Sequence, residues 1–167
     1  MKTVDAYRIG VLTLSDKGAQ GQRVDESGPV VQEMLHAVGE VTHTAVLPDD
    51  IKSIAELLIA WSDQEQLDLI VTTGGTGLTP RDVTPQATLQ VIVYEVPGMA
   101  EVMRMQSLKK TAHAMLSRAI VGVRRQTLIV NLPGSPKGAR ENLDAVMPAL
   151  PHALAKLTGD PSDCGQK

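Results

Sequence analysis

The chain of 167 residues is organised around the stretch VTTGGTGLTPRDVTP, residues 71–85. The apolar run that leads into it predicts a buried strand over residues 67–71. The stretch ends in Thr84-Pro85, which predicts a helix start with Thr84 as the N-cap and Pro85 at the first helical position. Residues 71–85 are therefore expected to connect a strand to a helix in an α/β fold.

This connection is rich in short polar side chains, and its three glycines are Gly74, Gly75 and Gly77. Glycine reaches positive φ without strain, so such a loop can turn its backbone N–H groups toward a ligand. In an open α/β sheet, ligands bind at the carboxyl ends of the strands, and a nearby helix N-terminus favours anions. A tight turn without a ligand is the alternative interpretation. Arg81 and Asp82, which follow soon after the glycines, favour a ligand-binding loop.

The rest of the chain alternates predicted strands with predicted helices. Apolar runs predict strands over 8–14, 41–47, 67–71, 120–123 and 127–130. Helical spacing predicts helices over 27–38, 51–61, 85–93, 99–110, 112–119 and 139–157, the last bent or broken by Pro148 and Pro151. This order predicts an α/β, three-layer fold with a mostly parallel sheet and helices on both faces. The length suits a single domain, placed over 1–160, with a loose C-terminal tail over 161–167.

Composition argues against several classes of partner. Aromatic residues make up 2% of the chain, so aromatic platforms that stack single-stranded nucleic acid are not expected. The formal net charge is −3, and the basic runs are no longer than Lys109-Lys110 and Arg124-Arg125. Nucleic acid is therefore not an expected partner.

Signals for secretion or membrane insertion are also missing from the sequence. Cys164 is the single cysteine and lies in a polar tail, so no internal disulfide is expected and we interpret it as an incidental exposed thiol. The N-terminus lacks the pattern of a signal peptide. No apolar stretch approaches the ~18 residues that suggest a membrane span. We therefore expect a cytoplasmic protein with no membrane partner.

Chemistry-bearing side chains follow the ends of several predicted strands. They are Ser15 and Asp16, Asp49, the residues from Thr73 to Asp82, and those from Asn131 to Pro136. Because right-handed crossovers bring the carboxyl ends of parallel strands to one edge, we expect these residues to form a single site. The chain has no P-loop, no G-x-G-x-x-G fingerprint and no G-x-S-x-G elbow, so these familiar motifs do not explain the site.

The same residues carry a resemblance to a known family. The motifs are Leu14-Ser15-Asp16, Pro48-Asp49-Asp50, Thr73-Gly74-Gly75-Thr76-Gly77 with Arg81-Asp82-Val83-Thr84-Pro85, Leu116-Ser117-Arg118, and Asn131-Leu132-Pro133-Gly134-Ser135-Pro136. In this order, from about Arg8 to Leu157, the chain resembles the molybdopterin-binding family. That family comprises the bacterial molybdopterin adenylyltransferases (MogA-like), the related MoaB proteins, and the G domains of plant and animal molybdenum-cofactor enzymes. The chain looks most similar to the adenylyltransferase branch, with one departure at Gln86, where the family commonly has Glu.

The resemblance implies a function in molybdenum cofactor biosynthesis. It implies a nucleotidyltransferase that adenylylates molybdopterin with ATP and Mg²⁺, giving adenylylated molybdopterin and pyrophosphate. It also implies a homotrimer, with molybdopterin synthase and a molybdate-insertion enzyme as protein partners. The alternative within the family is a non-catalytic, MoaB-like protein that binds molybdopterin or acts as a scaffold, and such members tend to form hexamers.

Individual residues take their expected roles from the same resemblance. Asp49 and Asp82 match the family's two functional aspartates, so we expect them to be catalytic and to bind Mg²⁺, which takes one or two carboxylates plus substrate phosphates. The residues expected to contact pterin or ATP are Ser15, Asp16, Thr73, Gly74, Gly75, Thr76, Gly77, Ser107, Pro133, Gly134 and Ser135. Which loop holds the pterin and which holds the nucleotide is left open.

The expected reaction needs no general base. A phosphate monoester has a second pKa of about 6, so the attacking phosphate of molybdopterin is already mostly dianionic at neutral pH. The reaction needs charge neutralisation and in-line positioning instead. The lack of a well-placed histidine is therefore no objection.

Structural roles are the alternative for several of these residues. Asp49 could cap the helix that follows it, although Asp50 can do so instead, and Asp82 could stabilise the next helix start. Arg81 could pair with a surface carboxylate, and Ser107 could face solvent. Residues 131–136 could form a plain strand-to-helix turn. Outside the family, a small hydrolase using Ser135 or Ser15 would lack an identifiable base.

Overall fold

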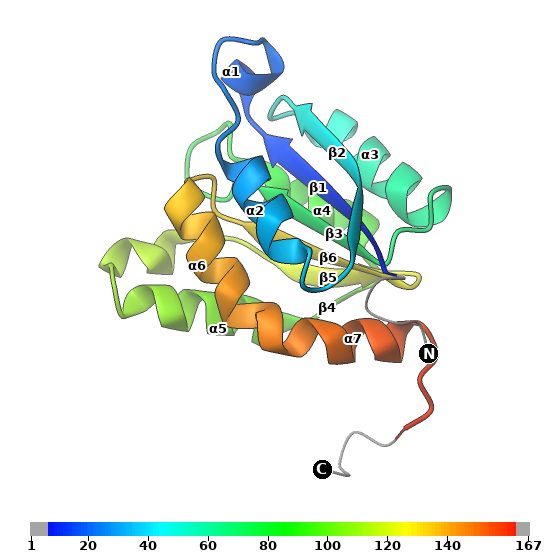
Figure 1. Cartoon of the computed structure of the whole chain (residues 1–167). Coiled ribbons are helices and arrows are strands. Elements are labelled where there is room, and N and C mark those ends of the chain that lie inside the picture. Colours follow the sequence, from blue (N-terminus) through cyan, green and yellow to red (C-terminus); the bar gives the residue numbers. More distant parts are fainter. Residues whose placement is uncertain (1–6, 163–167) are drawn as a thin grey trace.

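A six-stranded sheet forms the centre of the molecule (Figure 1). In the computed structural model, which describes residues 7–162, the strands are β1 (Arg8–Leu14), β2 (Glu40–Leu47), β3 (Leu69–Thr73), β4 (Tyr94–Glu95), β5 (Val121–Arg124) and β6 (Thr127–Leu132). Their order across the sheet is β2-β1-β3-β6-β5-β4. Strands β2, β1, β3 and β6 are parallel, whereas β5 runs antiparallel to β6 and β4 antiparallel to β5. The prediction of a mostly parallel sheet is confirmed.

Helices cover both faces of this sheet, which confirms the three-layer α/β prediction (Figure 1). One face is covered by α2 (Ser27–Leu35), α5 (Pro97–Leu108), α6 (Pro136–Val146) and α7 (Leu150–Leu157). The other is covered by α3 (Ile51–Asp63) and α4 (Thr84–Val91). The short α1 (Asp16–Ala19) projects beyond the carboxyl end of β1, at the top of Figure 1. The 3₁₀ helices η2 (Ala112–Leu116) and η3 (Met147–Ala149) precede β5 and α7.

Burial follows this layering. Strands β1, β3 and β6 lie in the middle of the sheet and bury nearly every residue, because helices cover them on both sides. Strand β2 lies at one edge and alternates exposed with half-buried residues. The larger apolar cluster lies beneath α2, α5, α6 and α7, and the smaller one surrounds Trp61 beneath α3 and α4. The sheet is therefore a rigid base from which loops project at its carboxyl edge.

Some element boundaries differ from the sequence prediction. Strand β3 begins at Leu69 instead of residue 67, because the Leu67 N–H still bonds the Trp61 carbonyl at the end of the preceding connection. The segment over 112–119 forms a 3₁₀ turn over its first part only. The long terminal helix is broken, as predicted, with Pro148 in η3 and Pro151 in the first turn of α7. Neither α1 nor β4 was predicted. With four residues in α1 and two in β4, each element is too short to show a hydrophobic period.

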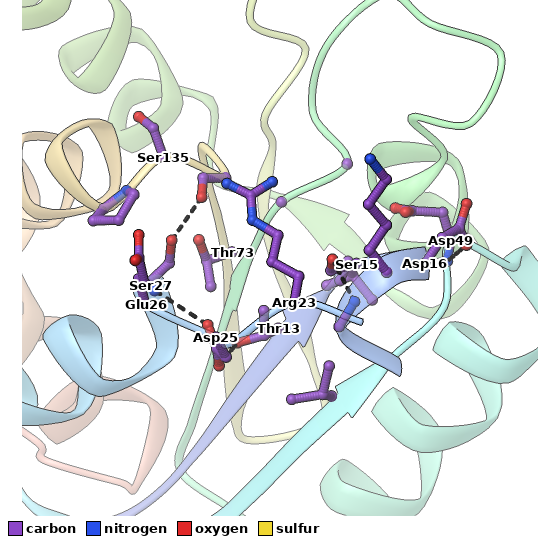
Figure 2. Close-up of a pocket in the computed structure, with 18 of the residues that line it drawn as sticks. Thr13, Ser15, Asp16, Arg23, Asp25, Glu26, Ser27, Asp49, Thr73 and Ser135 are labelled. Atoms are coloured by element: carbon purple, nitrogen blue, oxygen red, sulfur yellow. Dashed lines mark hydrogen bonds between the residues drawn. The ribbon is translucent and has the colours of Figure 1, made fainter. Parts of the chain in front are cut away.

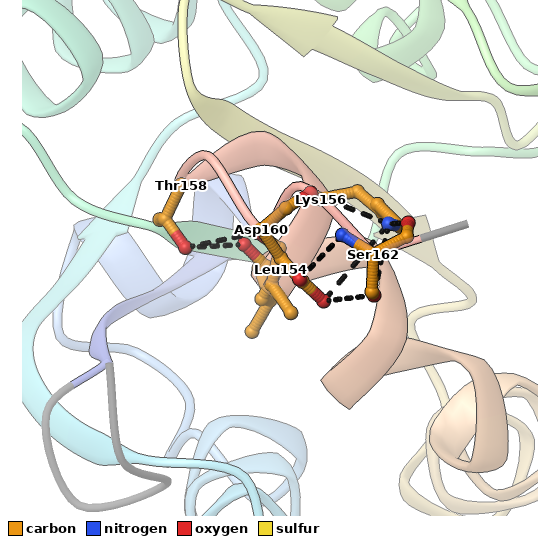
Figure 3. Close-up of polar contacts among 6 residues, drawn as sticks. Leu154, Lys156, Thr158, Asp160 and Ser162 are labelled. Carbon is orange, nitrogen blue, oxygen red and sulfur yellow. Dashed lines mark hydrogen bonds and ion pairs between the residues drawn. The ribbon is translucent and has the colours of Figure 1, made fainter. Parts of the chain in front are cut away.

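Lys156 holds the last described residues against α7 (Figure 3). Its Nζ donates to the main-chain oxygen of Ser162 and, at 3.3 Å, to that of Asp160. The Ser162 backbone N–H donates to the Asp160 carboxylate at 3.0 Å, and this bond holds the pKa of Asp160 below its usual range. Most of the tail predicted over 161–167, including Cys164, lies outside the described residues. No helix within residues 7–162 is long and apolar enough to cross a membrane.

Candidate functional site

A polar pocket of about 380 Å³ opens at the carboxyl edge of the parallel strands (Figure 2). Loops after β1, β2, β3 and β6 all contribute to its wall. The predicted site residues that line it are Ser15, Asp16, Asp49, Thr73, Gly74, Gly75, Asp82, Gly134 and Ser135. In Figure 2, Ser15, Asp16 and Asp49 form one side of the pocket, and Asp25, Ser27 and Ser135 lie on the other. The predicted convergence of strand-terminal loops is present in the structure.

The glycine loop after β3 has a conformation that requires glycine at two positions. Gly74 has φ +103° and Gly75 has φ +66°, both in the left-handed region that other residues rarely adopt. A Cβ on Gly74 would lie 2.4 Å from the Leu14 carbonyl oxygen. A Cβ on Gly75 would lie 2.2 Å from Thr84 Oγ1 and 2.9 Å from Asp49 Oδ1. The loop therefore passes directly beside the carboxylate of Asp49.

Thr84 supports this loop instead of capping the helix, so the predicted N-cap role is wrong. Thr84 is the first residue of α4, and the cap position belongs to Val83, whose side chain makes no capping bond. The Thr84 hydroxyl donates to the Gly74 carbonyl at 2.9 Å, and its N–H donates to the Gly75 carbonyl at 3.1 Å. These two bonds satisfy the carbonyls of a buried and a half-buried residue of the loop. Helix α4 thus fixes the glycine loop from behind.

The carboxylate of Asp49 lies in this pocket wall with one oxygen unpartnered among the described residues. Asp50 caps α3 through bonds from the Ser53 N–H at 2.8 Å and the Ser53 hydroxyl at 2.5 Å, so the capping role does not fall to Asp49. Asp49 Oδ1 is buried and has no hydrogen-bond partner among the described residues. Burial raises the pKa of the Asp49 carboxyl, and the neighbouring charges of Asp16 and Asp82 raise it further. Such a group favours the approach of a positive charge.

Asp16 is held by an arginine from the loop after β3. Arg81 donates from Nε to Asp16 Oδ2 at 2.9 Å and from Nη2 to Asp16 Oδ1 at 2.7 Å, a fork-shaped pair. Asp16 Oδ1 also accepts the Asp49 N–H at 2.9 Å. The hydrogen bond from Arg81 holds the pKa of Asp16 below its usual range. Asp16 therefore links the loops after β1, β2 and β3 and fixes the main chain at Asp49.

Asp82 is fixed through one of its two carboxylate oxygens. Its Oδ2 accepts the Thr79 N–H at 2.8 Å and the Thr79 hydroxyl at 2.7 Å, closing a small loop within residues 79–82. No hydrogen bond to Oδ1 is found within the described part of the chain. Asp82 lies in the pocket wall, and the side-chain hydrogen bonds found for it within residues 7–162 go to Thr79 and not to the first turn of α4.

The two aspartates fit a divalent cation that arrives with a phosphate ligand. Residues 7–162 contain no group of three or more His, Cys, Asp or Glu side chains arranged to hold a metal ion by themselves. Mg²⁺ is usually bound by one or two carboxylates together with substrate phosphates, so a pair is sufficient. Asp49 lines the pocket wall, and one oxygen of its carboxylate is buried without a hydrogen-bond partner among the described residues. A cation would also offset the repulsion among Asp16, Asp49 and Asp82 that raises the pKa of Asp49.

The loop after β6 closes the opposite side of the pocket. Thr73 Oγ1 donates to the Pro133 carbonyl at 2.7 Å, and Ser27 Oγ donates to the Gly134 carbonyl at 2.6 Å. Ser135 is the N-cap of α6, and its Oγ accepts the Gly138 N–H at 3.0 Å. The hydroxyl of Ser135 thus has a structural role, and it also lines the pocket at the start of a helix.

A second pocket of about 330 Å³ adjoins the first and shares Ser135 with it. The remaining predicted site residues line this second pocket: Thr76, Gly77, Ser107 and Pro133. Ser107 is half-buried, and its Oγ accepts a bond from Asn142 Nδ2 at 3.0 Å, so it does not simply face solvent. The residues that were expected to form a single site are therefore distributed between two adjoining pockets.

Comparisons with known proteins identify the family. The family described as "Probable molybdopterin binding domain" matches residues 10–152. A molybdopterin adenylyltransferase of Helicobacter pylori is 43% identical over 98% of this chain and 95% of its own length. The crystal structure of the molybdopterin biosynthesis enzyme MoaB from Thermus thermophilus is 52% identical, with a TM-score of 0.88 over 94% of this chain and 99% of that one. This chain belongs to the molybdopterin-binding family.

Relatives of this family also include much longer proteins. Gephyrin of Dictyostelium discoideum is 42% identical over 96% of this chain, but this chain spans 24% of that protein. The family predicted from the motifs is confirmed, and the Helicobacter pylori relative, matched over 95% of its own length, is named molybdopterin adenylyltransferase.

Sequence reasoning missed part of the first pocket of this family member. Asp25 accepts the Thr13 hydroxyl at 2.7 Å and the N–H groups of Ser27 and Gly28 at 3.1 and 2.9 Å, so it fixes the start of α2 against β1. Arg23 reaches across the pocket toward Ser135, and no hydrogen bond or ion pair of its side chain is found within residues 7–162 (Figure 2). An Asp shortly before a Ser-Gly helix start is a capping signal that could have drawn attention to Asp25. No sequence pattern points to Arg23.

Proposed function

We propose that this chain is a molybdopterin adenylyltransferase that acts in molybdenum cofactor biosynthesis. The observation that carries the proposal is the unpartnered, buried Asp49 oxygen beside the left-handed glycine loop. A carboxylate that costs folding energy and has no partner in the protein is typical of a site completed by substrate. Relatives matched over nearly their full length carry the name molybdopterin adenylyltransferase, which supports this assignment.

In the proposed reaction, a phosphate oxygen of molybdopterin attacks the α-phosphorus of ATP. A new P–O bond forms to the adenylyl group as the bond from the α-phosphorus to the bridging oxygen breaks, and pyrophosphate leaves. The attacking phosphate is mostly dianionic at neutral pH, so no residue of the chain needs to remove a proton. The contribution of the protein is alignment of two anionic substrates and neutralisation of their charge.

Asp49 and Asp82 are the proposed ligands of Mg²⁺, which would neutralise the triphosphate oxygens when bound. Asp16 and Arg81 position the main chain of Asp49 through their fork-shaped pair. The glycine loop allows phosphate to approach backbone N–H groups closely, and Arg23 adds a positive charge on the opposite side of the pocket. The remaining predicted contacts, including Thr76 and Ser107, line the second pocket and would hold the other substrate.

A pyrophosphate-release assay tests the proposal directly. Purified protein is mixed with ATP, Mg²⁺ and molybdopterin, and a parallel reaction lacks the pterin. We expect pyrophosphate release that depends on the pterin. Tight pterin binding without release would instead support a non-catalytic MoaB-like role, which the 52% identity to a MoaB protein makes the second candidate.

The oligomeric state, the protein partners and the cellular location are further predictions. A homotrimer is expected for the adenylyltransferase and a hexamer for the MoaB-like alternative, and light scattering in solution distinguishes them. Molybdopterin synthase and a molybdate-insertion enzyme stay the predicted protein partners. The cytoplasmic location also stays a prediction.

A further inference from the structure

Arg118 occupies a position that no substrate contact explains. It lines neither of the two pockets. Its Nε donates to the Gly77 carbonyl at 2.8 Å and its Nη2 to the Asp82 carbonyl at 2.5 Å, while its own N–H donates to the Thr76 carbonyl at 2.9 Å. Three contacts from one residue therefore hold both ends of the loop over residues 76–82.

This loop has little other support. Residues 78–81 are exposed, and its tip is closed only by the bonds between Thr79 and Asp82 and by the pair between Arg81 and Asp16. Exposed loops with few buried contacts open readily. Asp82 nevertheless presents a carboxylate to the first pocket from within this segment. Something outside the loop must fix its main chain if Asp82 is to hold a constant position.

The guanidinium group is suited to that task. Its planar fork can bond two acceptors in fixed directions at the same time, whereas a lysine ammonium acts as a single point charge. Hydrogen bonds from a charged donor are also stronger than neutral ones. The main chain next to Arg118 is fixed in turn by α5, because Arg104 of that helix donates to the Ala119 carbonyl at 2.8 Å. Hydrogen bonds therefore connect α5 to the segment of Arg118, and Arg118 to the main chain of Asp82.

We propose that Arg118 is a positioning residue that fixes Asp82 through the main chain of the 76–82 loop. The inference rests on the proposed function for the role of Asp82, but the tether itself can be measured without it. Arg118 acts only through carbonyl groups, so it orients Asp82 without touching substrate. Loss of the fork leaves the Asp82 side chain intact and allows its backbone to move.

Amide hydrogen exchange in the protein without ligands tests the tether. The variants are Arg118→Lys, which keeps the charge, and Arg118→Ala; Arg125→Lys, at the opposite edge of the sheet, is the matched control. We expect amides over 76–84 to exchange about tenfold faster or more in both Arg118 variants, with exchange in β1 and β6 unchanged. Uniformly faster exchange across the sheet would overturn the inference, because it would show a general loss of stability.

Metal binding and rescue test the consequence for Asp82. Binding of Mn²⁺ in the presence of ATP is expected to weaken about tenfold in Arg118→Lys. It is measured as the loss of the electron paramagnetic resonance signal of free Mn²⁺. In the pterin-dependent assay, kcat should fall by a larger factor than the KM for ATP rises. Millimolar guanidinium should partly restore both readouts in Arg118→Ala, and methylammonium should not.

The outcomes separate this inference from the proposed function. Faster loop exchange in the variants, together with no turnover in the wild type, would support the tether and refute the adenylyltransferase. Turnover in the wild type, with loop exchange, Mn²⁺ binding and kcat unchanged in Arg118→Lys, would overturn the positioning role and leave the proposed function standing.

Discussion

Helix α3 has an aspartate at each end, and the two are in opposite circumstances. Asp49 lies just before the helix at the carboxyl edge of the sheet, with one oxygen buried and unpartnered. Asp63 is the last residue of the helix, and both its oxygens are bonded: Arg124 donates to them at 3.0 and 2.5 Å, and Arg125 Nε lies 3.0 Å from Oδ1. Burial raises the pKa of Asp49, whereas the hydrogen bond from Arg124 lowers that of Asp63.

This difference indicates a functional role for the carboxylate of Asp49 and a structural role for that of Asp63. Asp63 stabilises the fold because arginines of the β5–β6 hairpin complete its bonding. Burial raises the pKa of Asp49 and so disfavours its ionised form, and the charges of Asp16 and Asp82 add to this. A group that lowers stability and lines a pocket is a candidate for binding something that the protein lacks.

The largest expected effect is the loss of activity on removing either pocket aspartate. We expect Asp49→Asn and Asp82→Asn each to lower pterin-dependent pyrophosphate release about 100-fold or more, because each removes a negative ligand for Mg²⁺. Asp49→Asn should not lower Tm, since it removes a charge that is costly to bury. Wild-type rates in both variants would show the proposed mechanism to be wrong.

The next effect comes from filling the space beside Asp49. Gly75→Ala places a Cβ 2.2 Å from Thr84 Oγ1 at a residue with φ +66°, so we expect a loss of about 2–3 kcal/mol in the free energy of unfolding, together with loss of activity. Gly98→Ala is the matched control, because no atom within 4 Å would meet its Cβ near the start of α5. Equal unfolding midpoints in urea for the two variants would contradict the assigned loop geometry.

Much of this fold was readable from the sequence, because apolar periods mark the buried strands and helices directly. The β1 prediction over 8–14 matches the structure, and Pro148 and Pro151 break the last helix as expected. Strand β4 was not readable, since its two residues are set by antiparallel pairing with Gly122 and Val123 in β5. Long-range pairing of this kind leaves no local signal.

The sequence predicted which residues belong to the candidate site, but not how these residues contact one another. The motifs predicted Asp49 and Asp82 as a pair, and both line one pocket. The sequence could not show that Thr84 uses its hydroxyl for the Gly74 carbonyl, because that choice depends on how the start of α4 lies against the glycine loop. Nor could it show that Arg118 reaches carbonyls 36 and 41 residues away. Contacts between distant segments determine both roles.

A smaller effect is expected at the other end of α3. Asp63→Asn leaves Arg124 and Arg125 without a carboxylate, so we expect Tm to fall by about 3–6 °C. Pyrophosphate release per folded molecule should stay at the wild-type rate, because Asp63 lines neither pocket. Calorimetry and the release assay on the same preparation check both statements. A loss of activity without a change in Tm would contradict the structural role of Asp63.

The smallest expected effect is an opposite pH dependence of the two aspartates. The pKa of Asp49 is raised above 3.8 in the folded protein, so the native state binds more protons and stability falls as the pH rises through the interval above 3.8. The pKa of Asp63 is lowered below 3.8, so its contribution is present above 3.8 and is lost as the pH falls through the folded pKa.

Tm profiles from about pH 3 to about pH 7 test this contrast. Relative to wild type, Asp49→Asn should gain about 1–3 °C as the pH rises, whereas Asp63→Asn should lose stability as the pH rises toward 3.8. The double variant should show the sum of the two difference profiles, because the length of α3 separates the sites. Difference profiles of the same sign would refute the contrast. Asp49 would then be an ordinary paired carboxylate, and the main argument for a cation at this pocket would be lost.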